Sequence, residues 1–439
     1  MPLLGSQGIS NSAWSCAVLA FYSETLCEGF SSAGVEAVGS FDGQALGNTA
    51  WAFSPLLLRD LPLIAAIASA SLPKLTEFEA TQNLSNTAWA FSPLQVRHGP
   101  LLDSISAEAI RRMPEFVSQQ LANTAWAYAS LPYLADPLSH AISAAALRTL
   151  SAFAPGGSPE DVLFGVDLRG LGWAFSFSSY LDCPLDQALR AAHLQIGRSL
   201  DASRGAAAEV AVATAARGDE APVGVGPSGG VPAPVFEDLR QGIAVVFKPP
   251  GWEVNDEGHS CLRQLSAYLQ SRYPRSAIVH DPEHAWGMLH RLDVPSSGLI
   301  LSGTTFEGYS CLKWQLDTAQ IAREYAVAVH GPCSPELSVV DVPVHHIKEG
   351  SAARSALAPT RSARRSTVCE MGKPALTWLR VLAHAERRSA RPAALLAARI
   401  RTGRRHQIRT HLHHAAHPTV ADGKYIDSLL VTSSTFSRR

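Results

Sequence analysis

A short segment in the second half of the chain holds residues whose types and spacing could do chemistry. Residues 287–301 read GMLHRLDVPSSGLIL, so Arg291 and Asp293 lie two positions apart, just before a Ser-Ser-Gly turn. A carboxylate in such a loop can act as a nucleophile or stabilise a developing charge, and an arginine can bind an anion. The same two residues could instead form a surface ion pair, which contributes little to stability.

A second, basic segment follows at residues 398–417, which read ARIRTGRRHQIRTHLHHAAH. Ile408, Leu412 and Ala415 keep helical spacing, which places Arg409 near the beginning of a helix. Arginines at the N-terminus of a helix favour binding of an anion, either a phosphate or a carboxylate. The histidines of this segment fall on different helical faces and have no acidic residue beside them, so we predict no metal site.

Short β-branched runs separated by turn residues surround these two segments and must position them. The strands predicted from these runs are Ile243–Phe247, Leu299–Leu301, Tyr325–Val329, Leu376–Leu382 and Leu395–Ile400. The helices predicted between them are Cys261–Tyr273 and Tyr309–Thr318. The second half of the chain is therefore predicted to be an α+β domain with a mixed, mainly antiparallel sheet and peripheral helices.

Five signatures in the second half resemble, in the same order, those of the RluA-type pseudouridine synthases. HRLDVPSSGLIL is similar to that family's HRLDxxTSGLLL motif, with Ser296 keeping the hydroxyl of the usual threonine. The others are EDLRQGIAVVFKPPGW, AREYAVAVHG, GKPALTWLRV and RTGRRHQIRTHL…HPTVADGKY. Together they extend from about Val235 to Ile426, and residues 349–366 resemble an expanded loop.

The resemblance implies a role for each matching residue. Asp293 corresponds to the catalytic aspartate that attacks the bound uridine, and Arg291 to the arginine that flips out the target nucleotide. Tyr325 corresponds to the active-site tyrosine that stacks on the uracil, and Arg409 to the basic residue that pairs with the catalytic carboxylate. The start of the closing block is implied to bind substrate through Arg404, Arg405, His406 and Gln407.

Isomerisation of uridine to pseudouridine breaks an N-glycosidic bond and forms a C–C bond, with no redox change. The resemblance therefore implies no cofactor and no metal, and it implies rRNA or tRNA as the partner. Flipping a base out of structured RNA costs a few kcal/mol, which an arginine wedge and an aromatic platform would offset. The alternative function is an RNA-binding protein whose synthase fold no longer turns over.

The first half of the chain repeats one phrase, seen as LGNTAWAFSPL, LSNTAWAFSPL and LANTAWAYASL. Its tryptophans recur at intervals of 37, 38, 37 and 47 residues, and they are Trp14, Trp51, Trp89, Trp126 and Trp173. A period of this length predicts an all-α solenoid of helical hairpins. Leu84, Ala88 and Phe91 would share one helical face, and each Trp and Phe is expected to fill a hydrophobic seam between helices.

The repeated phrase resembles the octotricopeptide and FAST/RAP-associated helical repeats, whose members include many organellar RNA-binding proteins. Direct RNA binding would need basic residues, yet residues 1–233 carry a net charge of −9. Residues 234–439 carry +8, and residues 354–409 hold 14 basic but only two acidic residues, which favours a phosphate-binding surface there. The repeats are therefore expected to select the RNA or to bind a protein partner, and an interaction scaffold centred on them is a further alternative.

These observations predict a multidomain protein. Residues 1–200 form the helical repeats, residues 201–234 an Ala/Gly/Pro-rich linker, and residues 235–439 the synthase domain. The seven cysteines include no CxxC pair, which favours a reducing, intracellular compartment. No apolar run is long enough to span a membrane. Mitochondria and plastids are candidate locations through the repeat resemblance alone, and the chain begins inside a repeat, so a start upstream of Met1 stays open.

Overall fold

The structure is a computed structural model, and it describes the chain with several gaps. The described residues are 5–19, 21, 23–56, 58–131, 133, 135–215, 230–255, 263–346, 366–368, 372–387, 390–420 and 422. The chain divides into two units, each of which combines separate stretches of sequence. The first unit consists of Met1–Phe116, Trp126–Leu138 and Ala322–Arg439, and the second of Val117–Ala125 and Ser139–Ile321.

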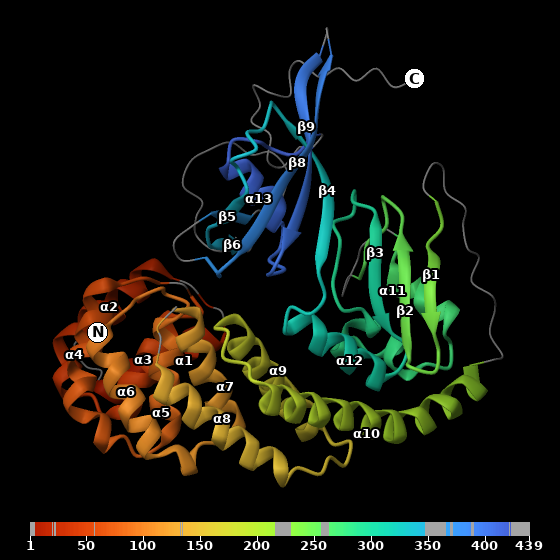
Figure 1. Ribbon diagram of the computed structural model, residues 1–439. Coiled ribbons are helices and arrows are strands. Elements are labelled where there is room, and N and C mark those ends of the chain that lie inside the picture. The colour runs from red at the N-terminus through yellow and green to blue at the C-terminus, as the bar shows by residue number, and fades with distance from the viewer. Residues whose placement is uncertain are drawn as a thin grey trace. The chain divides into compact units, whose positions relative to one another are not determined.

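The first half of the chain is helical over its described residues (Figure 1). Its helices are α1 (Ser6–Val18), α2 (Glu24–Ala37), α3 (Gly43–Phe53), α4 (Leu61–Ser71), α5 (Thr81–Phe91), α6 (Gly99–Arg111), α7 (Ser118–Ser130), α8 (Asp136–Ser151), α9 (Pro159–Phe177) and α10 (Cys183–Ala215). The repeated phrase falls on α1, α3, α5 and α7. Within the first unit α3 packs against both α1 and α5, so copies of the phrase lie side by side.

The apolar positions of the repeated phrase form the core of these helices. Leu84, Ala88 and Phe91 of α5 are fully buried, as their helical spacing predicts. The expectation for the tryptophans is wrong in part. Trp51 and Trp89 are only half-buried and Trp14 is 44 % exposed. In α3 and α5 the core is filled by the smaller residues and by Phe53 and Phe91, which follow the Trp by two positions and therefore lie on nearly the opposite side of the helix.

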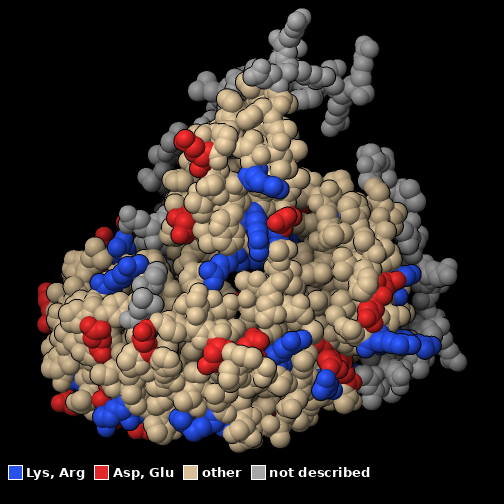
Figure 2. Space-filling view, in the orientation of Figure 1, with Lys and Arg blue, Asp and Glu red and all other residues tan. Residues whose placement is uncertain are grey.

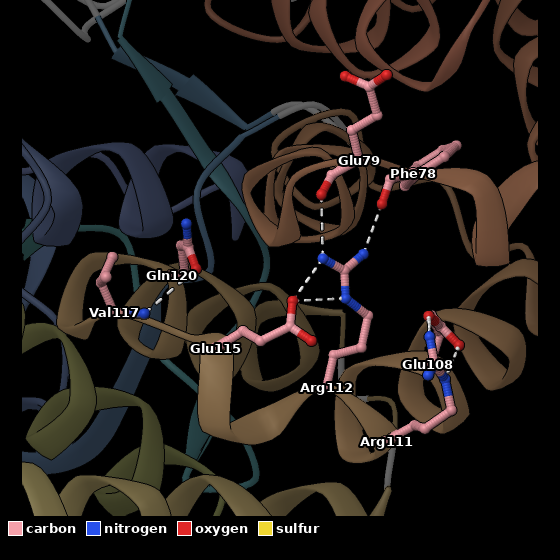
Figure 3. Close-up of polar contacts among 8 residues, drawn as sticks. All are labelled: Phe78, Glu79, Glu108, Arg111, Arg112, Glu115, Val117 and Gln120. Atoms are coloured by element: carbon pink, nitrogen blue, oxygen red, sulfur yellow. Dashed lines mark hydrogen bonds and ion pairs between the residues drawn. The ribbon is translucent and has the colours of Figure 1, made fainter.

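Successive repeats are joined by a cation that binds backbone carbonyl oxygens of the repeat before it. The Nζ atom of Lys74 donates to the carbonyl oxygens of Gly39 and Phe41 at 2.9 and 2.7 Å. One repeat later, Arg112 donates to the carbonyl oxygens of Phe78 and Glu79 at 2.5 and 3.1 Å (Figure 3). These carbonyls lie just before α3 and α5, so each cation fixes the backbone at the N-terminus of a helix that carries the repeated phrase.

Arg112 also bonds within its own repeat. Its guanidinium donates to one carboxylate oxygen of Glu115 at 2.6 and 2.9 Å, whereas Arg111 donates to both carboxylate oxygens of Glu108 at 2.5 and 2.9 Å (Figure 3). Arg112 is 9 % exposed, so nearly all of its hydrogen-bonding capacity serves the fold. Lys74 and Arg112 therefore act as structural staples between repeats.

The second unit contains a three-stranded antiparallel sheet. The strand order is β1-β2-β3, formed by β1 (Ala233–Asp238), β2 (Ile243–Lys248) and β3 (Gly298–Gly303). The helices α11 (Leu265–Arg272) and α12 (Phe306–Asp317) follow β2 and β3 in the chain. β2 and β3 agree with the predicted strands, and α11 and α12 with the two predicted helices except at their ends.

Helices α9 and α10 pack directly on α12 within this unit (Figure 1). Trp314 of α12 is fully buried, and its indole N–H donates to Asp186 at 3.1 Å. Glycines at the contact let the helices approach closely. A Cβ atom at Gly172 would lie 2.5 Å from the Trp314 ring, and one at Gly197 would lie 2.7 Å from the carbonyl oxygen of Phe306.

The predicted linker needs a correction at its beginning. Residues 201–215 belong to α10, and residues 216–229 lie outside the described residues. Asp201 accepts hydrogen bonds from the backbone N–H groups of Phe306 and Glu307 at 2.8 and 2.9 Å. Arg204 pairs with Asp281 at 2.5 Å. The alanine-rich composition that suggested a linker also has high helix propensity. The contacts of Asp201 and Arg204 stabilise this part of α10 as a helix.

The first unit contains a four-stranded sheet with the order β4-β9-β8-β5 and a two-stranded sheet, β6-β7. The strands are β4 (Arg323–His330), β5 (Val339–Asp341), β6 (Val344–His346), β7 (Ser366–Val368), β8 (Leu376–Arg387) and β9 (Ala390–Ile400). Helix α13 (Gln407–His414) contributes Leu412 to the core of the larger sheet, beside Val329 and Leu396.

Every strand pair described is antiparallel, whereas a mixed sheet was predicted. The short connections between β1 and β2 and between β8 and β9 require antiparallel pairing there, because parallel neighbours need long crossovers. The predicted loop at residues 349–366 lies outside the described residues except for Ser366, which begins β7.

Candidate active site

Asp293 lies in the loop that leads into β3 of the second unit. The loop stays close to that strand, since the N–H of Leu289 donates to the carbonyl oxygen of Leu301 at 3.1 Å and the N–H of Leu301 donates to His290 Nε2 at 3.3 Å. Leu292 points into the core, which leaves Arg291 exposed and Asp293 half-buried. The side chains on either side of Leu292 are thus presented toward solvent.

The Asp293 loop is tied to the end of β2 by Lys248, the last residue of that strand. Lys248 is fully buried, and its Nζ atom donates to the carbonyl oxygens of Pro249, Trp252 and Val294 at 3.1, 2.8 and 3.3 Å. The N–H of Gly251 donates to Val294 as well, at 2.8 Å. Lys248 therefore uses its three N–H bonds to join the Lys-Pro-Pro-Gly turn to the residue that follows Asp293.

Burial lowers the pKa of Lys248 to about 8, and the negative charge of Asp293 acts in the opposite direction. A pKa of about 8 keeps most of the side chain protonated at neutral pH. The positive charge of Lys248 therefore lies within electrostatic reach of the Asp293 carboxylate. The three hydrogen bonds of Lys248 orient the turn that follows β2.

Tyr325 lies in β4 of the first unit, at the edge of the four-stranded sheet and paired in register with Ala398. Its side chain is half-buried and packs against the core that contains Val329 and Leu396. A tyrosine at this position is anchored by the core through its ring, while the exposed part of the side chain stays accessible.

The basic segment before α13 forms a tight turn with one residue in the left-handed region. His406, which immediately precedes α13, has φ = 55°. That conformation is uncommon for a residue with a side chain and often marks a functional site. The carbonyl oxygen of Arg405 accepts a hydrogen bond from the hydroxyl of Ser366 at 2.8 Å, which fixes the turn to β7.

Arg404 begins this turn and is half-buried. Its Nε atom donates to the carbonyl oxygen of Pro374 at 3.0 Å. Burial, with a smaller contribution from the charge of Arg323, lowers the pKa of Arg404 to about 10. The group still carries its positive charge at neutral pH, so it can attract an anion.

Gln407, the first residue of α13, is 3 % exposed and serves the fold. Its Oε1 atom accepts from Thr402 Oγ1 at 2.8 Å and from the N–H of Arg404 at 3.0 Å. Its Nε2 atom donates to Leu376 at 3.0 Å and to Thr377 at 3.1 Å. Both donors and both acceptor positions of the amide are thereby used, so the geometry assigns Gln407 to bracing the turn and not to contacting a substrate.

Arg409 forms a two-pronged ion pair with Asp422, both hydrogen bonds measuring 2.6 Å. Asp422 is 9 % exposed and accepts a further hydrogen bond from Thr419 at 2.7 Å. The sequence predicted the position of Arg409 near the beginning of a helix, and the structure confirms it as the third residue of α13. Asp422 was missed. The signal that could have found it is the acidic residue of the HPTVADGKY element.

The predicted site residues are thus distributed over the two units. The second unit brings Arg291 and Asp293 together with Lys248. The first unit brings the basic turn and Arg409 together with Asp422, next to the sheet that carries Tyr325. Over the described ranges there is no group of three or more His, Cys, Asp or Glu residues that could hold a metal ion. None of the helices in those ranges is long and apolar enough to cross a membrane.

Comparison with known proteins shows which family this part of the chain resembles. Residues 242–414 match the family model described as RNA pseudouridylate synthase. Over these residues the chain is therefore similar to the pseudouridine synthase class, and the antiparallel sheets described above carry the predicted motifs.

Two curated proteins illustrate the similarity. The chain is 32 % identical over 191 residues to ribosomal large subunit pseudouridine synthase D of Pasteurella multocida, covering 44 % of this chain and 52 % of that protein. It is 34 % identical over 199 residues to the protein of the same name from Nitrosomonas europaea, covering 44 % and 48 %. The chain thus spans about half the length of the curated relatives it matches.

Proposed function

We propose that this protein is an RNA pseudouridine synthase that isomerises uridine in rRNA or tRNA, with Asp293 as its catalytic carboxylate. The observation that carries the proposal is the fixed position of the Asp293 loop. Three hydrogen bonds from the buried Lys248 join that loop to the turn after β2, inside the segment that matches the synthase family. A catalytic group needs such support, because small displacements of a reacting group cost much of the rate.

The reaction requires only rearrangement within the substrate. The bond between N1 of the base and C1′ of the ribose breaks, the base turns, and a bond forms between C5 and C1′. C5 then loses its proton to solvent and N1 gains one, so atoms and charge balance without a cofactor. The carboxylate of Asp293 can attack or stabilise the electron-poor centre, and the positive charge of Lys248 lies within electrostatic reach of it.

The other predicted residues keep the roles that the family resemblance implies. Arg291 is exposed next to Asp293, where a guanidinium could enter the gap left by a flipped nucleotide. Tyr325 would stack on the uracil, and Arg409 would bind the catalytic carboxylate or the substrate from α13. Arg404, Arg405 and His406 would attract the RNA backbone, with Gln407 holding their turn in place.

The test is release of tritium from RNA labelled at uridine C5. The intact protein and Asp293→Asn are each offered bulk rRNA and bulk tRNA, with substrate in excess. We expect release by the intact protein from one of the two pools, and a loss of at least about a thousandfold in Asp293→Asn. Release that survives in Asp293→Asn would exclude the assigned nucleophile.

A filter-binding measurement of RNA affinity on the same two proteins distinguishes the synthase from the alternative, an RNA-binding protein without catalysis. Asp293→Asn should bind RNA as tightly as the intact protein, because the substitution preserves size and leaves the basic turn unchanged. RNA binding without tritium release by the intact protein would favour an RNA-binding protein that no longer catalyses isomerisation.

A further inference from the structure

The helices that carry the repeated phrase share a second pattern on their outer face. The second residue of each helix is a glutamine, followed four residues later by an asparagine and three residues after that by the tryptophan. The positions i, i+4 and i+7 lie on one face of a helix. The triplets of the first three repeats are Gln7, Asn11 and Trp14 in α1, Gln44, Asn48 and Trp51 in α3, and Gln82, Asn86 and Trp89 in α5. We call these nine residues the amide–tryptophan ladder.

The tryptophans of successive repeats stack on one another. The ring centroids of Trp14 and Trp51 lie 6.2 Å apart, those of Trp51 and Trp89 6.3 Å, and those of Trp89 and Trp126 6.0 Å. The last two pairs have interplanar angles of 29°. The rings therefore form a partly exposed aromatic row that runs from one repeat to the next.

The amides of the ladder are exposed or half-buried and make no hydrogen bond through their side chains in the part of the chain that the structure describes. Each amide offers two donor hydrogens and an acceptor oxygen. A row of such groups beside an aromatic row is suited to an extended polypeptide, whose main chain presents N–H and C=O groups regularly. Two residues of an extended chain span about 6.6 Å, close to the step between tryptophans.

RNA fits this surface poorly. The four helices α1, α3, α5 and α7 contain no Lys, Arg, Asp or Glu, and residues 1–58 contain no Lys or Arg at all. The cations Lys74 and Arg112 already bind backbone carbonyls. Figure 2 shows basic and acidic side chains interspersed over the helical part of the face in view, without a basic patch.

The charge of the repeats points to a basic partner. Residues 1–138 contain 11 acidic and five basic residues, a net charge of −6. One acidic residue precedes each of the later phrase helices: Asp42 before α3, Glu79 before α5 and Glu115 before α7. Asp42 and Glu79 lie two and three residues before the glutamines of α3 and α5, so they border that side of the ladder. A partner with lysine or arginine side chains would complement this border.

We propose that the amide–tryptophan ladder binds an extended, basic polypeptide segment of a partner protein. Its Gln and Asn side chains would hydrogen-bond the main chain of that segment, and the tryptophan row would pack against its aliphatic stems. Repetition of the same triplet suits a main chain, which presents the same groups at every step. This inference is independent of the proposed catalytic activity, because the ladder contains none of the predicted site residues.

The test measures fluorescence anisotropy of labelled probes with the full-length protein. The probes are the 12-residue peptides (Lys-Thr)6 and (Glu-Thr)6 and a 12-nucleotide oligouridine. The variant replaces Gln44, Asn48, Gln82 and Asn86 by alanine, which has the highest helix propensity, so the helices should persist. The matched control replaces Gln187 and Gln195, two exposed glutamines of α10, by alanine.

We expect the intact protein to bind (Lys-Thr)6 at least about tenfold more tightly than (Glu-Thr)6, and the ladder variant to lose about tenfold or more while the control is unchanged. The double variant Asn48→Ala/Asn86→Ala should show the same direction with a smaller loss. Equal binding of (Lys-Thr)6 by the intact protein and the ladder variant, or no binding at all, would overturn the proposal. Oligouridine binding that depends on the four amides would replace it with an RNA surface.

Discussion

The carboxylate of Asp201 caps the N-terminus of α12, where it accepts a hydrogen bond from the backbone N–H of Phe306 at 2.8 Å. The residues are 105 positions apart. Asp201 belongs to α10, the last helix of the helical half, and Phe306 to the domain that matches the synthase family. The last helices of the first half are therefore built into the second unit and cover α12.

Asp201→Ala should lower the free energy of unfolding by about 1 kcal/mol, because it removes the side-chain acceptor for the first N–H groups of α12. The measurement is the urea denaturation midpoint of the intact chain and the variant. Glu28→Ala, at an exposed position of α2, serves as the control and should change the stability by less than about 0.5 kcal/mol. Equal midpoints for Asp201→Ala and the control would show that the cap contributes nothing.

His193 should make the second unit sensitive to acid. It lies in α10 beside Trp314, is 5 % exposed, and its pKa is lowered to about 3 by burial and by the nearby charges of Arg169, Lys313 and His284. Because the folded-state pKa is below the unfolded value of about 6.5, its contribution to stability is present above pH 6.5 and is lost as the pH falls toward 3. Between pH 7.5 and pH 5 the loss is about 2 kcal/mol.

The measurement that checks this is the free energy of unfolding at pH 7.5 and pH 5. His193→Leu keeps the volume of the side chain but cannot bind a proton, so the variant should lose about 2 kcal/mol less than the intact chain over this interval. His280→Leu, at an exposed position, should keep the pH dependence of the intact chain. An unchanged pH dependence in His193→Leu would contradict the assignment.

Lys248→Met should impair both folding and the proposed isomerisation. The carbonyl oxygens of Pro249, Trp252 and Val294 would lose their buried donor, at a cost of about 2–4 kcal/mol of stability. The Asp293 loop would also lose its tie to β2, so tritium release should fall by at least about tenfold under conditions in which the variant is folded. Lys313→Met, which removes a cation paired with Asp317 on α12, is the control. Full activity in a folded Lys248→Met would exclude a positioning role.

Arg409 and Asp422 should behave as one unit. Arg409→Lys cannot reproduce the two parallel hydrogen bonds, and Asp422→Asn removes the charge that receives them. Each variant should lower kcat for tritium release by about tenfold or more, with a smaller change in KM. The double variant should lose little more than either single variant, since residues that act together are not additive. Fully additive losses would show that the pair does not cooperate.

The sequence by itself determined the local features of this protein. Hydrophobic alternation predicted β2, β3, β4, β8 and β9, because strand formation depends on residues that are neighbours in the chain. Helical spacing predicted the buried face of α5 in the same way. The ordered motifs indicated a pseudouridine synthase domain, and residues 242–414 match that family. The roles of Asp293, Tyr325 and Arg409 in catalysis stay predictions.

Only the tertiary structure decided which side chains serve the fold and which are left for binding. Gln407 was predicted to bind substrate but is used by four internal hydrogen bonds. Trp51 has an apolar side chain that suggested the core, yet it is stacked and half-exposed. Asp201 was assigned to a linker and instead caps α12. In each case the side chain contacts residues that are distant in sequence. Tertiary packing, and not the local residue pattern, brings those residues together.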